Sequence, residues 1–191
     1  MITGIDIIKE QLSIAAGNDL SLKKEDISIH GWSMEARINA ENPFSNFLPD
    51  IGLAKELRWP SGAFVRIDSH MRSKLQISKE YDSMIGKVIT WGRTREECRL
   101  RMIRALKETR IEGFATTVPF HLWLIQKEDF ISSSFDTKFI EKNWPEKEEL
   151  NRKTNDEAIV AGILVQRENA SHKTMATGSL WKNRATIDGL C

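Results

Sequence analysis

The alternation of apolar and polar side chains over residues 32–39 constrains the fold of this chain more than any other feature. An alternation with period two predicts a strand with one buried face and one open face. The apolar face carries Trp32, Met34, Ala36 and Ile38. The polar face carries Ser33, Glu35, Arg37 and Asn39. A guanidinium between two polar neighbours is a rigid, permanently charged group that can bind an oxyanion, so this face is either solvent-facing surface or one wall of a site.

The rest of the pattern predicts an α+β domain, with an antiparallel and barrel-like core and flanking helices. The expected strands cover residues 27–40, with an interruption at Gly31, and 53–59, 63–69 and 84–91. The expected helices cover residues 3–16, 94–107, 117–126, 137–141 and 146–166, and the chain beyond residue 167 is expected to be a tail or linker. Thr3 is expected to cap the first helix and Gly17 to end it.

The helix predicted over residues 94–107 begins with a capping box made by Thr94 and Glu97. Its apolar face carries Cys98, which we expect to be a small buried residue. Its other face carries four arginines, Arg95, Arg99, Arg101 and Arg104. These arginines are interpreted as a solvated helix face.

The composition excludes several classes of protein. The 191 residues include 28 Lys and Arg against 27 Asp and Glu, and this near balance argues against a dedicated nucleic-acid binder. No apolar run is long enough to span a membrane and no signal segment opens the chain, so we expect a cytoplasmic location. Two cysteines and four histidines show no metal-ligand spacing, and no metal site is predicted. His121 is expected to be a core histidine with a satisfied hydrogen bond.

A second polar constellation lies in the segment 81–87, Tyr-Asp-Ser-Met-Ile-Gly-Lys. Asp82 comes directly before a predicted strand and could present its carboxylate to Arg37 on a neighbouring strand, where it would orient the guanidinium. Alternatively, Asp82 caps its own turn, as aspartates in turns commonly do.

Taken together, these motifs resemble the C-terminal domain of biotin carboxylase, the ligase component of acetyl-CoA, propionyl-CoA and pyruvate carboxylases. The resemblance rests on residues 34–41 (Met-Glu-Ala-Arg-Ile-Asn-Ala-Glu), on the segment 81–87 and on residues 116–121 (Thr-Thr-Val-Pro-Phe-His), and it extends over about residues 1–143. It implies three regions. Residues 1–26 would end an ATP-grasp region, residues 27–143 would form the C-terminal domain, and residues 144–191 would be a helical extension and tail.

The resemblance also implies a chemistry. In the family, bicarbonate is activated by phosphoryl transfer from Mg-ATP, and the CO₂ equivalent is captured by biotin on a carrier protein. The arginine matching Arg37 stabilises the negative charge that develops on the biotin ureido oxygen, as a preorganised donor does. Asp82, Glu35 and Asn39 would support it. ATP, Mg and bicarbonate would bind mainly to an upstream ATP-grasp region, so this chain alone is expected to be inactive. Met1 is either a true start or a boundary within a longer protein.

The implied partners are the upstream region, the biotin carboxyl carrier protein and a carboxyltransferase, and a eukaryotic parent would be mitochondrial. Arg66 and Met84 are candidate contacts of a homodimer. The family usually has Gly-Gly-Phe-Gly-Val-Arg before its third strand, whereas this chain has Ser-Gly-Ala-Phe-Val-Arg at residues 61–66, which puts that dimer in question. The alternative function is a non-catalytic dimerisation or docking module derived from this domain.

Overall fold

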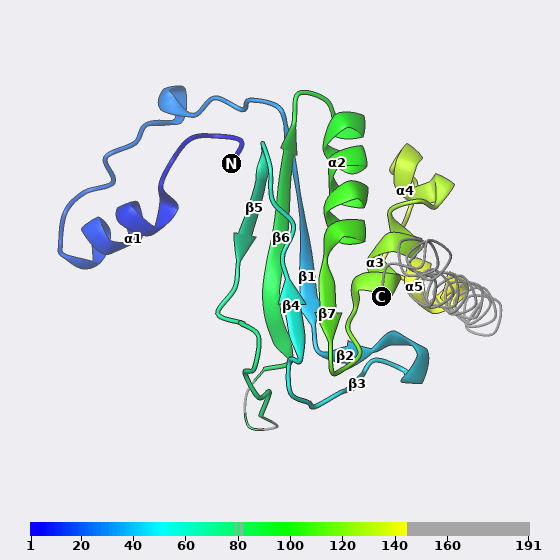
Figure 1. The fold of residues 1–191 in the computed structure, drawn as a ribbon. Coiled ribbons are helices and arrows are strands. Elements are labelled where there is room, and N and C mark those ends of the chain that lie inside the picture. Colours follow the sequence, from blue (N-terminus) through cyan, green and yellow to red (C-terminus); the bar gives the residue numbers. More distant parts are fainter. Residues whose placement is uncertain (79, 81, 145–191) are drawn as a thin grey trace, which may run out of the picture. The chain divides into compact units, whose positions relative to one another are not determined.

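The computed structural model describes residues 1–78, 80 and 82–144. The chain divides into two compact units, residues 1–135 and residues 136–191, and each is considered by itself. Figure 1 shows the elements of the first unit, which contains all the strands of the described residues. The predicted helix over 146–166 and the tail beyond it lie outside the described residues.

The central sheet has three antiparallel strands in the order β1-β6-β5. They are β1 (Trp32–Asn39), β6 (Met84–Gly92) and β5 (Val65–Asp68). Two small antiparallel pairs accompany it, β2 (Glu41–Asn42) with β3 (Leu48–Pro49) and β4 (Glu56–Arg58) with β7 (Arg110–Glu112). The predicted α+β antiparallel architecture is therefore confirmed. The described strands do not close into a barrel, because β1 is an edge strand.

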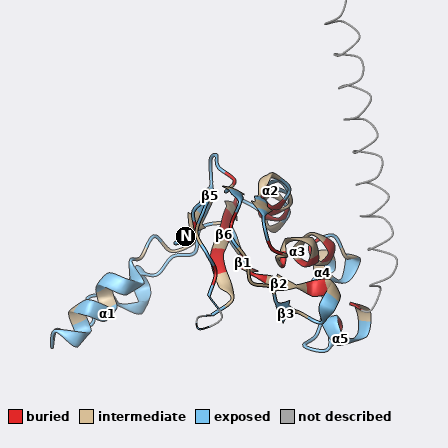
Figure 2. Cartoon of the chain, turned by 60° about the horizontal axis from the view of Figure 1, so that its bottom comes forward, coloured by how far each residue is buried: buried red, intermediate tan, exposed pale blue. Residues whose placement is uncertain are grey.

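Helix α2 (Arg95–Glu108) packs on one face of the central sheet and thereby decides which face of β1 is open (Figure 1). The core combines alternate residues of β1 and β6 with one side of α2, namely Ala36, Ile38, Val88, Cys98, Met102, Ala105 and Leu106. Gly92 lets the helix approach, since a Cβ there would clash with the amide nitrogen of Cys98. Figure 2 shows this burial on β6 and α2. The predicted burial of Cys98 is confirmed.

The N-terminal predictions need two corrections. Helix α1 runs from Ile7 to Ala15, and its N-cap is Asp6, whose side chain accepts from the amide of Lys9, so the prediction of Thr3 as cap is wrong. The first strand begins at residue 32 rather than 27, because Gly31 has a φ of 71° and breaks the extended backbone. A Cβ at Gly31 would also lie 2.6 Å from the ring of Trp91.

The remaining elements are short. Helix α3 covers Val118–Leu124, α4 covers Glu128–Ser132, and the 3₁₀ turns η1 and η2 cover Lys24–Asp26 and Pro43–Ser45. Strand β7 and helix α4 are not in the predictions, because three to five residues are too few to show a period. In the second unit, α5 covers Phe139–Asn143 where a short helix over 137–141 is predicted. No helix in the described part of the chain is long and apolar enough to cross a bilayer.

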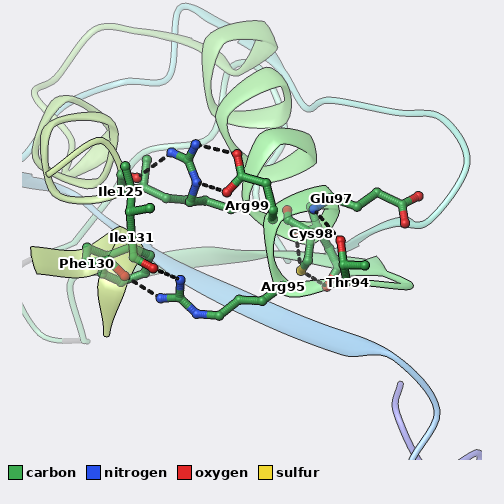
Figure 3. A network of polar contacts seen from close by, with 10 residues as sticks. Thr94, Arg95, Glu97, Cys98, Arg99, Ile125, Phe130 and Ile131 are labelled. Atoms are coloured by element: carbon green, nitrogen blue, oxygen red, sulfur yellow. Dashed lines mark hydrogen bonds and ion pairs between the residues drawn. The ribbon is translucent and has the colours of Figure 1, made fainter. Parts of the chain in front are cut away.

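The interpretation of the α2 arginines as a solvated face is wrong for Arg95 and Arg99 (Figure 3) and for Arg101, whose side chain is 19% exposed and donates to the carbonyl of Trp91. Arg99 is buried, donates to the carbonyl of Ile125 at 2.9 Å and pairs with Glu96 at 2.6 Å. Arg95 donates to the carbonyls of Phe130 and Ile131 at 2.5 and 2.7 Å. These carbonyls lie in the last turns of short helices, where the usual i+4 amide is lacking, although the Phe130 carbonyl also accepts from the amide of Ser133. Arg99 therefore attaches α3 to α2, and Arg95 attaches α4 to α2.

Candidate active-site wall

Arg37 lies on the open face of β1, opposite Ala36 and Ile38. Its guanidinium contacts the sulfur of Met84, with Nε at 3.4 Å and Nη2 at 3.2 Å. A thioether is a weak acceptor. No ion pair joins Arg37 to an acidic residue in the described part of the chain. The guanidinium therefore keeps its charge and strong donor capacity available.

The charged residues around Arg37 are paired with one another. Glu35 lies 3.6 Å from the Nζ of Lys87 on β6. Arg66 on β5 forms two hydrogen bonds of 2.8 Å with the carboxylate of Asp68, and this partner raises the pKa of Arg66 above its usual value. Arg66 is exposed and its guanidinium is paired with Asp68, so a dimer contact through Arg66 would involve this ion pair.

Asn39 belongs to a separate polar group at the end of β1. Its Nδ2 donates to Glu41 at 3.0 Å, and Glu41 also accepts from the hydroxyl of Ser83. The Oδ1 of Asn39 is buried without a hydrogen-bond partner. Ser83 also lines a hollow of about 410 Å³, whose other lining residues are Ala40, Pro49, Asp50, Ile51, Ile77 and Ser78. The side chain of Asn39 thus bonds to Glu41 and not to the guanidinium of Arg37.

Asp82 does not contact Arg37 in the described structure. Its Oδ1 accepts from the backbone amide of Met84 at 3.1 Å, which is the turn-capping alternative. Because Met84 in turn places its sulfur against the guanidinium, Asp82 is connected to Arg37 through Met84. Met84, which the sequence makes a candidate dimer contact, is thus also a side-chain partner of Arg37.

The sequence did not predict that two further residues contact Arg37. Thr117 and His121 both hydrogen-bond to the backbone carbonyl of Arg37, at 3.1 and 2.8 Å. Burial lowers the pKa of His121, and the hydrogen bond to this carbonyl opposes the shift. The expected satisfied hydrogen bond of His121 is confirmed, but its partner could not be read from a residue 84 positions away.

The turn before β5 departs from the family pattern in a structurally visible way. Phe64 occupies a left-handed conformation with a φ of 61°, where the family pattern has glycine. The ring of Phe64 lies 4.9 Å from that of Trp91 and 5.0 Å from the guanidinium of Arg101. These ring contacts offset the backbone strain that a non-glycine residue incurs there.

Comparison with known proteins agrees with this architecture. The sequence profile of the biotin carboxylase C-terminal domain matches residues 35–142. Biotin carboxylase 1 of Bacillus subtilis is 53% identical over 141 residues, which are 74% of this chain and 31% of that protein. The biotin carboxylase of Haemophilus influenzae is 46% identical over 142 residues, which are 74% of this chain and 32% of that protein.

Solved structures show the same fold. The biotin carboxylase component of a pyruvate carboxylase aligns with a TM-score of 0.73 at 39% identity, over 77% of this chain and 32% of that one. The biotin carboxylase domain dimer of 2-oxoglutarate carboxylase from Hydrogenobacter thermophilus, in complex with MgADP and bicarbonate, aligns with a TM-score of 0.72 at 39% identity, over 74% of this chain and 31% of that one. The chain thus spans about a third of the length of these relatives, and it belongs to the biotin carboxylase C-terminal domain family.

Proposed function

We propose that this chain forms one wall of the biotin site of a biotin carboxylase, with Arg37 as the donor that stabilises negative charge on the ureido oxygen of biotin. The observation that carries this proposal is a guanidinium on an open sheet face that has a thioether, and no carboxylate, as its side-chain partner among the described residues. Such a donor gains most when charge develops beside it in a site that excludes water. Carrier-bound biotin fits because its ureido oxygen accepts N–H groups.

ATP, Mg and bicarbonate are assigned to the part of the enzyme that this chain does not cover. The Hydrogenobacter thermophilus domain binds MgADP and bicarbonate, and this chain covers 31% of its length. Asp82 would act on Arg37 through Met84, while Glu35 and Asn39 would complete the polar wall. The carrier protein and a carboxyltransferase are the proposed partners. Arg66 and Met84 are the proposed contacts if the parent forms a homodimer. The proposed location is cytoplasmic, or mitochondrial in a eukaryote.

The N-terminal segment supports docking to the rest of the enzyme. No residue of α1 is buried, and Ile8 and Leu12 are 64% and 67% exposed. Beside the helix lies an almost wholly apolar hollow of about 510 Å³, whose apolar lining residues are Ile5, Ile7, Leu20, Leu22 and Ile27. Since contiguous apolar surface of this kind marks an interaction site, we assign this segment to contact with the upstream ATP-grasp region.

A chimeric carboxylase tests the role of Arg37. In it, this chain replaces the matching segment of Bacillus subtilis biotin carboxylase 1, to which it is 53% identical. Arg37→Ala should lower kcat for carboxylation of biotin by about 10²- to 10³-fold, the usual effect of losing such a donor. Arg37→Lys should restore part of the rate, because lysine keeps the positive charge but lacks the paired N–H donors of the guanidinium.

Arg110→Ala is the matched control, because Arg110 is an exposed strand arginine that pairs with Glu112 and Glu56 away from β1. It should leave kcat unchanged. A loss smaller than tenfold in Arg37→Ala would refute the oxyanion role. An inactive chimera that is folded and binds ATP would favour the alternative, a docking module without catalysis.

A further inference from the structure

The edge of β1 is closed at Arg37 by a helix rather than by a strand. β1 has one neighbour among the described strands, β6, so backbone groups on its other side need partners elsewhere. At Asn39 the partner is Thr117: the amide of Asn39 donates to the Thr117 hydroxyl at 3.0 Å, and the amide of Thr117 donates to the Asn39 carbonyl at 3.1 Å. Thr117 therefore pairs with the strand as a ladder residue would.

The carbonyl of Arg37 receives two donors from the same segment. The Thr117 hydroxyl donates at 3.1 Å, and His121 lies one helical turn later with Nε2 at 2.8 Å. A carbonyl only accepts, so the neutral ring carries its proton on Nε2 in this contact. The hydroxyl of Thr117 thus accepts from one β1 residue while it donates to another, and Thr117 is buried.

Helix α3 carries His121, and Thr117 is its N-cap residue. Its first turn is closed by the bond from the His121 amide to the Thr117 carbonyl. At its other end Arg99 of α2 donates to the carbonyl of Ile125 (Figure 3). The backbone of Arg37 is therefore connected through α3 to the helix that packs on the sheet.

We propose that Thr117 and His121 are positioning residues for Arg37: they fix the backbone from which its guanidinium projects onto the open face. This inference rests on the proposed function of Arg37. Among the described contacts, the guanidinium has the thioether of Met84 as its side-chain partner. The bonds from Thr117 and His121 to the Arg37 carbonyl, here called the backbone clamp, restrain this residue in addition to the β1–β6 ladder, in which Arg37 lies opposite Lys87. A displacement of about 1 Å in a charge-stabilising group can cost on the order of 10²-fold in rate.

The first test uses the whole 191-residue chain and needs no catalysis. Thr117→Val removes the hydroxyl at nearly constant volume, and Thr117→Ser restores it. Amide hydrogen exchange of Asn39 should accelerate by about tenfold in Thr117→Val, in keeping with the loss of one hydrogen bond, and should return in Thr117→Ser. The NMR signal of the Arg37 Nε–H should shift in the same variant.

Thr116→Val is the matched control, because among the described residues the Thr116 hydroxyl accepts from the amide of Val118, within its own turn. It should leave both the Asn39 exchange and the Arg37 signal unchanged. For His121, Phe removes the Nε2 donor, whereas Gln can present an amide donor at a similar place. His121→Phe should shift the Arg37 signal and His121→Gln should reverse most of the shift.

The second test separates positioning from mere support of the fold. In the chimeric carboxylase, Thr117→Val should lower kcat for biotin carboxylation by about 10- to 100-fold while KM for ATP stays unchanged. A variant that is less stable but keeps the Arg37 signal and kcat would overturn the inference. If Arg37→Ala lowers kcat and Thr117→Val does not, the clamp is wrong and the role of Arg37 stands. If Arg37→Ala has no effect, the proposed function fails, and the exchange data still decide whether the clamp exists.

Discussion

At the scale of single residues, Arg37 has stronger hydrogen bonds at its main-chain carbonyl than at its side chain. The side chain meets a thioether, while the carbonyl of the same residue receives donors from Thr117 and His121. The flanking charges Glu35 and Lys87 pair with each other across β1 and β6 and leave the guanidinium unneutralised. A charged group whose backbone is fixed and whose donors remain available is well suited to meet a charge that appears only during reaction.

His121 predicts a dependence of stability on pH. Burial lowers the pKa of His121 below its ordinary value of 6.5, so the folded protein resists protonation of this ring. As the pH falls below about 6.5, the unfolded chain takes up the proton first, and the free energy of unfolding decreases until the pH has passed the lowered pKa. Urea unfolding from about pH 8 to about pH 5 should show wild type losing stability relative to His121→Gln. A constant difference across this range would contradict the assignment.

At the scale of elements, α2 both covers the sheet and organises the helices that follow it. Its apolar side buries Met102 and Leu106. Arg99 binds a carbonyl at the end of α3, and Arg95 binds carbonyls at the end of α4. The guanidinium of Arg95 also lies 5.1 Å from the ring centre of Phe130. Short helices are marginal by themselves, so these contacts supply the order that α3 and α4 cannot generate alone.

Arg99 and Arg104 give a matched pair of predictions on one helix. Arg99→Met keeps the aliphatic stem but leaves the Ile125 carbonyl without its charged donor, and we expect the free energy of unfolding to fall by about 2 kcal/mol. Arg104→Met removes an exposed pair with Glu108 and should change it by less than about 0.5 kcal/mol. Urea denaturation of both variants measures the difference. Equal effects would show that the bond from Arg99 to the Ile125 carbonyl stabilises the fold no more than an exposed ion pair does.

At the scale of the whole molecule, the sheet with α2 has its own core, whereas the N-terminal segment does not. The buried core residues come from position 36 onward, and α1 contributes none. Figure 2 shows α1 mostly exposed and without a buried residue. The relatives are about three times longer than the part that this chain matches. We therefore expect the apolar residues of the first segment to be stabilised by the remainder of the enzyme.

Leu12 tests this expectation. In the isolated chain, Leu12→Glu should change the free energy of unfolding by less than about 0.5 kcal/mol, because the side chain is 67% exposed. In the chimeric carboxylase the same change should lower the free energy of unfolding by about 1.5–3 kcal/mol, which is what burial of a leucine side chain contributes. Gln11→Glu adds the same charge at an exposed neighbouring position and should be neutral in both. If Leu12→Glu left the free energy of unfolding of the chimera unchanged, α1 would be excluded from the docking surface.

The periodic parts of the fold were predictable. The long β6 and the helix capped by Thr94 appear close to their expected bounds, and the strand around Arg37 ends close to where it was expected, since period and capping are local properties. The interruption at Gly31 was predicted, but not that residues 27–30 lie outside the strand; the left-handed φ of Gly31 and the close approach of Trp91, which leaves no room for a Cβ, depend on a distant residue. For the candidate site, the open face of Arg37 followed from alternation, but its pairing with Asp82 did not appear among the described contacts.

By itself, the sequence determined the alternation of β1, the antiparallel class of the fold and the family, because these depend on residue order over short spans. Only the tertiary structure decided where the long-range partners lie. Thr117 meets the Arg37 carbonyl across 80 positions, and Arg99 meets Ile125 across 26. A hydrogen bond between distant segments leaves no period in the sequence, since its donor is one threonine or arginine among several. It exists because chain packing brings that one group within about 3 Å of an unpaired carbonyl.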